Sequence, residues 1–237
     1  MKEGFAVEKN IISVSNYEIP FEELLNALHM SAEDDMIDSI AEIHRSAAQI
    51  AKPVAIYMPV VPRIKGGEMF LNGVNFNNRF VYDKLSNCSL VAPYVVSCGR
   101  EIDEWSKGFG DLFEQFAADT LKQIYLKVIR EKLINELANK HFTSHKKISW
   151  LSPGSLKEWP VSAQVPLFEL LGGVTNDIGV ELKEDSLLML PTKSASGIMF
   201  ESNGDYENCR YCPRLDCPNR RAGFEGEIDG GNALDND

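Results

Sequence analysis

Three cysteines near the C-terminus have a spacing that could hold a metal. They are Cys209, Cys212 and Cys217, and a proline follows the last of them. Two thiolates separated by two residues can share one metal ion when a tight turn directs both sulfurs inward, and a Cys-Pro step is common at the end of a cluster-binding run. The pattern predicts zinc or an iron–sulfur cluster, with Cys88 and Cys98 as the first candidates for a missing ligand. The alternative is a set of free thiols in a polar loop.

Four arginines surround these cysteines. They are Arg210, Arg214, Arg220 and Arg221. Their charge could offset that of a thiolate-bound metal or dock an acidic partner, although a solvated surface would have the same composition.

Two segments of small and polar residues could form the walls of a small-molecule site. The first is Ser152-Pro153-Gly154-Ser155, where the glycine permits close approach of the backbone to a ligand. The second runs from Pro191 to Gly197, and we expect it to expose hydroxyls and amides. On spacing alone, each segment is more typical of a plain turn.

Composition and charge exclude several classes of protein. The chain has 237 residues, with 24 Lys plus Arg against 35 Asp plus Glu, for a net charge of −11. Nucleic acids and anionic membranes require clustered positive charge, so neither is expected as a partner. The sequence contains no glycine-rich nucleotide-binding loop and no nucleophile elbow. Without an apolar segment of signal-peptide or bilayer-spanning length, we expect a cytoplasmic protein.

Hydrophobic periodicity predicts the elements that position these residues. We expect helices at 21–28, 34–51, 111–141 and 161–171, and strands at 54–61, 89–97, 186–190 and 197–200. The helix at 111–141 is the longest. The strand at 89–97 contains Pro93, which favours an edge position or a bulge, and Cys98 follows it as a buried structural cysteine. Helices and strands do not alternate regularly, so the class is α+β.

The order and spacing of several segments resemble the activation domain of vitamin B12-dependent methionine synthase. The matching features are Ser-Pro-Gly before an amphipathic helix with Leu-Phe-Glu-Leu-Leu, then the run from Ile178 to Met189, and then Pro191 to Gly197. The match is good from about Leu151 to Phe200 and weaker upstream. The family's arginine in the ligand loop falls on Trp150, its tyrosine after Pro-Gly falls on Ser155, and a further aromatic residue falls on Met199.

This resemblance implies a C-shaped domain with a twisted antiparallel sheet and flanking helices, in which S-adenosylmethionine is presented to cobalamin. It implies a ligand site with one wall at the Ser-Pro-Gly turn and a second in the segment that ends at Gly197. The implied site residues are Trp150, Ser152, Pro153, Gly154, Ser155, Lys193, Ser194, Ser196 and Gly197.

We therefore expect three parts in the chain: an activation-domain-like part at 1–203, a Cys-rich metal-binding part at 204–224 and an acidic tail at 225–237. Our hypothesis is a stand-alone activation or partner module for a corrinoid-dependent methyltransferase, with cobalamin contributed only by a partner protein. The alternative is a metal- or iron–sulfur-stabilised binding module that keeps the fold without using S-adenosylmethionine.

Overall fold

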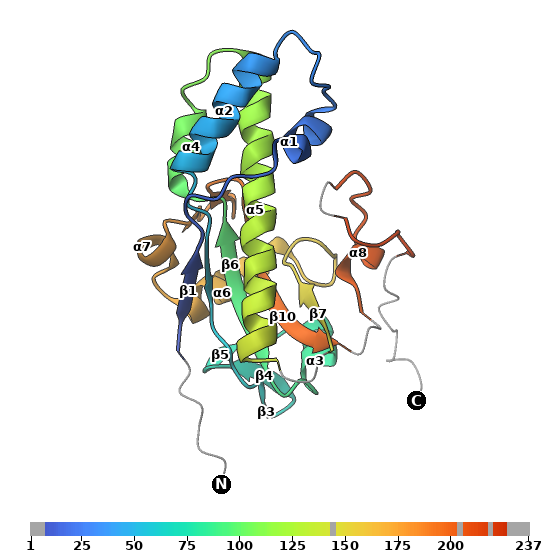
Figure 1. Ribbon diagram of the computed structural model, residues 1–237. Coiled ribbons are helices and arrows are strands. Elements are labelled where there is room, and N and C mark those ends of the chain that lie inside the picture. The colour runs from blue at the N-terminus through green and yellow to red at the C-terminus, as the bar shows by residue number, and fades with distance from the viewer. Residues whose placement is uncertain (1–7, 143–145, 203–205, 218–219, 227–237) are drawn as a thin grey trace.

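A five-stranded antiparallel sheet forms the centre of the molecule (Figure 1). The computed structural model describes residues 8–142, 146–202, 206–217 and 220–226. In spatial order the strands are β1 (Asn10–Ser13), β2 (Val54–Tyr57), β6 (Val91–Ser97), β10 (Ser194–Ser202) and β7 (Lys147–Leu151). Together with the long helix α5 (Leu112–Lys140), this sheet confirms the predicted α+β class.

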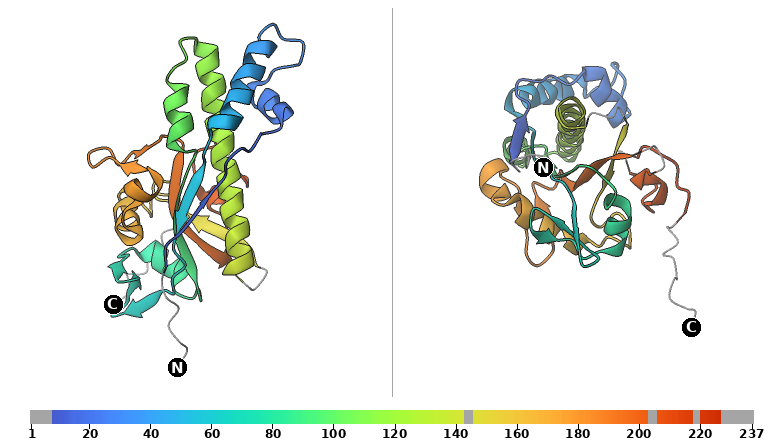
Figure 2. Two further views of the ribbon diagram at one scale, coloured as in Figure 1. Left: turned by 60° about the vertical axis from the view of Figure 1, so that its left-hand side comes forward. Right: turned by 90° about the horizontal axis from the view of Figure 1, so that it is seen from below.

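Helix α5 takes part in two hydrophobic clusters. Its N-terminus is capped by Asp111, whose carboxylate accepts hydrogen bonds from the first turn. Its first half, including Leu121 and Tyr125, packs with α1, α2 and α4, whereas Ile129 and Leu133 in the second half pack on one face of the sheet. Figure 2 shows the helices of the first cluster extending beyond the end of the sheet. Their bounds are Phe21–Leu28 for α1, Ile37–Ile50 for α2 and Arg100–Ser106 for α4.

The opposite face of the sheet is covered by short elements. A third hydrophobic cluster, with Trp159 fully buried in it, joins that face to a small sheet and to further helices. These elements are β3 (Arg63–Lys65), β4 (Glu68–Leu71), β5 (Val74–Asn75), α3 (Arg79–Leu85), the 3-10 turn Val161–Ala163, α6 (Gln164–Leu171) and α7 (Val174–Ile178). The remaining elements are β8 (Glu181–Leu182), β9 (Met189–Leu190) and α8 (Asn208–Tyr211). None of the described helices is long and apolar enough to cross a bilayer.

Strand β6 corrects one prediction. It is third of the five strands, so the expectation that Pro93 lies at an edge or a bulge is wrong. Met58 donates a hydrogen bond to the carbonyl of Pro93 over 3.0 Å, but proline has no N–H to return it. Strand β2 accordingly ends at Tyr57, and pairing resumes with an isolated bridge between Val60 and Val91. The sheet therefore accommodates the proline at the point where its neighbouring strand ends.

Candidate functional site

The predicted ligand turn follows β7, an edge strand of the sheet. Gly154 has a φ of +78°, and its N–H donates to the carbonyl of Trp159 over 2.8 Å. The N–H of Ser155 donates to the carbonyl of Ser152 over 3.2 Å. A Cβ at Gly154 would lie 3.2 Å from the Cβ of Val161, so the close approach allowed by this glycine is to the protein itself. The turn is closed by its own backbone, and ligand recognition there would depend on side chains.

The predicted second wall is a strand, not the expected loop. Strand β10 begins at Ser194, whose hydroxyl oxygen lies 2.9 Å from a serine hydroxyl of β6. The buried hydroxyl of Ser196 lies 3.4 Å from an amide oxygen of α6, on the sheet face opposite α5. Lys193 forms a 2.7 Å ion pair with a carboxylate in the first half of α5. These three side chains do not converge on the turn.

Gly197 is the residue of that segment that adjoins the turn. Strand pairing sets Ile198 opposite Leu151, which brings Gly197 beside Ser152. A Cβ at Gly197 would collide with the carbonyl oxygen of Leu151 and would lie 3.1 Å from the ring and the hydroxyl of Tyr94. Tyr94 thus crosses over Gly197, and its hydroxyl interacts with the side chain of Ser152. Burial raises the pKa of Tyr94, so the phenol is neutral near pH 7.

Trp150 in β7 has two arginines close to its ring. The guanidinium carbon of Arg221 is 3.4 Å from the centre of the indole ring, and that of Arg130, on α5, is 5.9 Å from it. Both positive charges also act on the hydroxyl of Tyr94. Trp150 is 8% exposed and packs toward α5, so the position is largely covered.

Glu207 neutralises one of these two arginines. Its side chain is only 2% exposed, and its carboxylate accepts from Arg221 over 2.7 Å and from Lys147 over 2.9 Å. Burial acts to raise the pKa of Glu207, but the hydrogen bonds and charges of these two partners hold it below the usual range. Arg130 donates no hydrogen bond and forms no ion pair with any residue in the described ranges, and its buried Nε has no partner.

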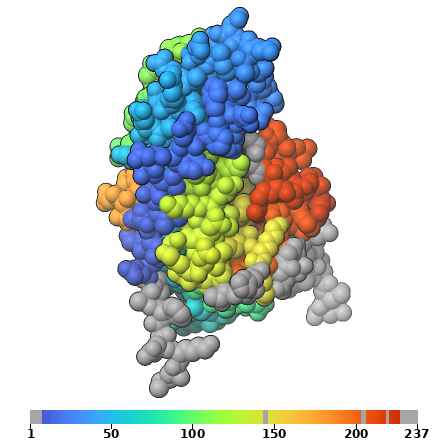
Figure 3. Space-filling model, viewed as in Figure 1, coloured from blue at the N-terminus to red at the C-terminus, as the bar shows by residue number. Residues whose placement is uncertain are grey.

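The C-terminal segment, which we define as residues 206–217 and 220–226, packs on β7 and on the turn. Asn208 donates to the hydroxyl of Ser155 over 3.0 Å, and the hydroxyl of Ser149 donates to the carbonyl of Tyr206 over 2.7 Å. The ring of Tyr206 joins the cluster on the far face of the sheet. In Figure 3 the segment, in orange-red, forms the surface to the right of α5. The site is therefore built from both the predicted turn and the Cys-rich region.

The cysteines of this segment, Cys209, Cys212 and Cys217, are the predicted metal ligands. Among the described residues, no three His, Cys, Asp or Glu side chains come together in a group that could hold a metal ion, so the structure does not support the metal centre, which stays a prediction. The segment is organised around the guanidinium of Arg220, which donates four hydrogen bonds of 2.6 to 2.9 Å to backbone carbonyls. The acceptors belong to Cys209, Cys212, Arg214 and Ala222. The guanidinium of Arg220 satisfies the backbone carbonyls that converge there.

The two remaining cysteines lie elsewhere. Cys98 is fully buried among the helices beside α5, as predicted, and burial raises the pKa of its thiol to about 12, which disfavours the thiolate. Cys88 is half-buried beside α3, and burial is also the main cause of its raised pKa.

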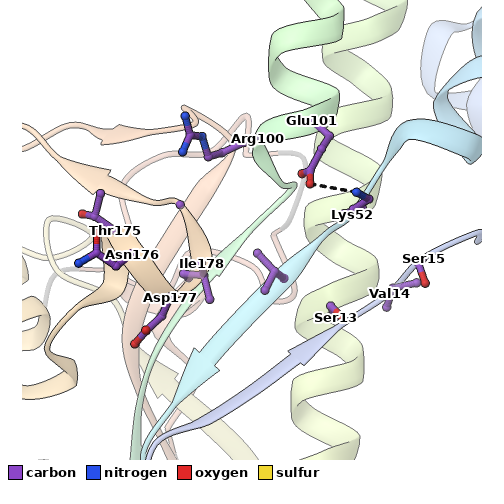
Figure 4. A pocket seen from close by; sticks show the side chains of 12 residues that line it. Ser13, Val14, Ser15, Lys52, Arg100, Glu101, Thr175, Asn176, Asp177 and Ile178 are labelled. Carbon is purple, nitrogen blue, oxygen red and sulfur yellow. Dashed lines mark ion pairs between the residues drawn. The ribbon is translucent and has the colours of Figure 1, made fainter.

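A separate pocket of about 560 Å³ lies at the opposite edge of the sheet (Figure 4). The end of β1, the start of α4 and the residues of α7 line it. Its carboxylates are paired within the protein, Glu101 with Lys52 over 3.4 Å and Asp177 with Lys9 over 2.8 Å. None of the site residues predicted from sequence lines this pocket.

Sequence reasoning located the turn but missed most of its surroundings. Tyr94, Arg130 and Glu207 come from three different elements, and no local motif links them to the turn. One signal was present in the sequence: an acid, Glu207, next to a run containing four arginines, which is consistent with internal ion pairing.

Comparison with known proteins supports the fold. No protein-family model and no curated protein sequence matches the chain. Among solved structures, the chain is similar to the MetH reactivation domain bound to AdoHcy, with a TM-score of 0.59 and 14% sequence identity. The similarity covers 85% of this chain and 81% of that one. The two proteins therefore share a fold, as the resemblance in sequence order predicted.

Proposed function

We propose that this protein is a stand-alone activation or partner module for a cobalamin-dependent methyltransferase such as methionine synthase. The observation that carries the proposal is the fold similarity to the MetH reactivation domain over 85% of the chain. The sequence has no Asp-x-His-x-x-Gly run of the kind whose histidine ligates cobalt, so the corrinoid is assigned to a partner protein. The module would support the reductive remethylation of that corrinoid.

The site best suited to an S-adenosyl ligand is the region around Trp150, the Ser152–Ser155 turn and Gly197. The solved neighbour holds AdoHcy, which supports a related ligand here. In this chain the turn's backbone is closed on itself, so the side chains around Trp150 would carry recognition. Lys193, Ser194 and Ser196, implied by the resemblance, lie away from the turn and would act at most indirectly.

The test combines binding with a reactivation assay. Calorimetry first measures the affinity of the purified chain for S-adenosylmethionine and AdoHcy. The chain is then mixed with a cob(II)alamin-loaded methionine synthase fragment that lacks its own activation domain, together with a one-electron donor and S-adenosylmethionine. We expect the visible spectrum to convert to methylcobalamin faster with the chain than without it. No acceleration at a saturating concentration of the chain would contradict the proposal.

A second candidate is a binding module that keeps the fold but does not use a methyl donor. The observation that favours it is that the C-terminal segment covers part of the predicted ligand site: Arg221 packs on Trp150, and Asn208 hydrogen-bonds to the turn. Binding of a corrinoid protein without binding of either S-adenosyl compound would favour this second function.

A further inference from the structure

The pocket of about 560 Å³ at the β1 edge of the sheet has the size of a small-molecule site (Figure 4). It lies at the edge opposite β7, so it is separate from the region around Trp150 and the turn. Its lining mixes polar side chains with the apolar Val14, Val54 and Ile178. Recognition of a ligand there depends on the polar groups that are not already bound within the protein.

Two glycines bring the walls of this pocket together. Gly99 has a φ of +97°, and a Cβ there would collide with the carbonyl oxygen of Lys52, so the absence of a side chain lets the start of α4 approach the segment before β2. Gly179 follows α7 with a φ of +69°, and a Cβ there would collide with the Cδ of Arg100. The stem of Arg100 therefore crosses Gly179, and Figure 4 shows it extending from α4 toward the side of the pocket that α7 forms.

Arg100 is the charged side chain of this lining that has no ion pair within the described residues. The two carboxylates of the pocket are each paired with a lysine. Arg100 also acts on Glu104, but that exposed carboxylate is bound to Lys107 over 2.7 Å. In the part of the chain that the structure describes, the guanidinium donates no hydrogen bond. The pocket thus holds one cation whose donors are open to a ligand.

Uncharged hydrogen-bonding groups line the same pocket. They are the hydroxyls of Ser13 and Ser15 and the amide of Asn176, and none of these side chains is hydrogen-bonded to another residue of the described ranges. A guanidinium offers two parallel N–H groups that match the two oxygens of a carboxylate. Hydroxyls and an amide can bind a polar group next to that carboxylate. One open cation with neutral donors suits a monoanion better than a phosphate dianion.

We propose that this pocket is a second small-molecule site, which takes a small organic acid with one carboxylate and a neighbouring hydroxyl. Arg100 receives the carboxylate, and the serines and Asn176 bind the hydroxyl. Such a site goes beyond the proposed function, because it needs neither an S-adenosyl compound nor a corrinoid partner.

The test uses lactate as the probe and lactamide, its uncharged analogue, as the matched control. Amide NMR of the full chain follows residues 13–15, 99–101 and 175–179 while each compound is added at constant ionic strength. We expect lactate to cause saturable shifts in these residues. Lactamide should bind at least about tenfold more weakly, because it cannot form a charge-assisted hydrogen bond with the guanidinium. Lactate shifts that do not saturate, or equal binding of lactamide, would overturn the proposal.

Variants at Arg100 assign the binding to this side chain. Arg100→Met should weaken lactate binding at least about tenfold, whereas the control Arg45→Met, an exposed arginine on α2, should leave it unchanged. Arg100→Lys keeps the charge but loses the paired N–H geometry, so its affinity should lie between those of the wild type and Arg100→Met. The dispersion of the NMR spectrum checks that each variant is folded. Equal lactate affinity of the wild type and folded Arg100→Met contradicts the site.

Inorganic phosphate tests the class of anion. We expect it to bind more weakly than lactate to the wild type, and tighter binding of phosphate would overturn the assignment to a carboxylate. All these titrations are made without S-adenosyl compounds, so their failure leaves the proposed function in place. Failure of the reactivation assay likewise leaves the lactate result standing.

Discussion

Two arginines in different parts of the molecule have opposite surroundings. Arg220 in the C-terminal segment donates four hydrogen bonds to carbonyl oxygens, whereas Arg130 on α5 donates none to a described residue. The Nε of each is buried without a hydrogen-bond partner, so the two differ in their terminal nitrogens, and those of Arg220 hold the backbone of its own segment in place. The terminal nitrogens of Arg130 donate to no described residue, so its partners rather than its residue type separate it from Arg220 as a structural cation.

The largest effect expected from this comparison is on Arg220. Arg220→Met leaves four carbonyls without their donor, and we expect the C-terminal segment to lose about 3 kcal/mol of local stability. Hydrogen exchange of the amides in 206–217 and 220–226 measures this loss. The matched control is Arg214→Met, an exposed arginine paired with Asp216 at 3.8 Å, which should change exchange little. Equal exchange in both variants would show that the carbonyl contacts are not stabilising.

Glu207→Gln should have the next largest effect, about 2 kcal/mol of unfolding free energy, because a buried carboxylate with two cationic partners is lost. Its pKa is lowered on folding, so the carboxylate stabilises the fold above its ordinary value of about 4.5, and this stabilisation is lost as pH falls through the lowered pKa. Denaturation between about pH 6 and pH 3 should show a smaller loss of stability in the variant than in the wild type. Parallel pH profiles would rule out this role of Glu207.

Arg221→Lys tests the stacked contact on Trp150 while keeping a charge for Glu207. Lysine lacks the planar group that lies 3.4 Å from the indole centre, so we expect a loss of about 1 kcal/mol in chemical denaturation. Arg214→Lys, made on the exposed side of the same segment, serves as the control and should be neutral. A neutral Arg221→Lys would mean that the ion pair alone accounts for the contact.

The smallest effect is expected at Arg130. In the absence of ligand, Arg130→Met should change the free energy of unfolding by less than about 0.5 kcal/mol, or should raise it, because an uncompensated charge is removed while the methylene packing is kept. Thermal denaturation of the ligand-free variant measures this. A loss comparable to that of Arg220→Met would break the comparison and make Arg130 a structural residue.

The long helix and the α+β class could be predicted from sequence because both depend on local periodicity. Helix α5 carries a sustained apolar pattern and begins at Asp111, a favourable capping residue. Strand β7 was missed because it is short and its register is set by pairing with β10, while its central Ser149 is polar yet buried. Strand pairing between distant segments leaves little trace in a single sequence.

The candidate site was predictable only in part for the same reason. The Pro-Gly turn is a local signal, and the turn is present. Tyr94 reaches the turn across Gly197 from another strand. Arg130 reaches the ring of Trp150 from α5, a helix distant from the turn in sequence. The cysteine spacing constrains where the sulfurs can meet, but it does not show that an arginine draws the same backbone together.

The position of α5 also bears on how the protein folds. At about 1.5 Å per residue, its 29 residues form a rod about 43 Å long that serves as a wall of two separate hydrophobic clusters. Tyr125 faces the helices and Ile129, one turn later, faces the sheet, without a break between them. Because one unbroken helix supplies apolar cover to both clusters, we expect the helical layer and the sheet to lose their structure in a single cooperative transition.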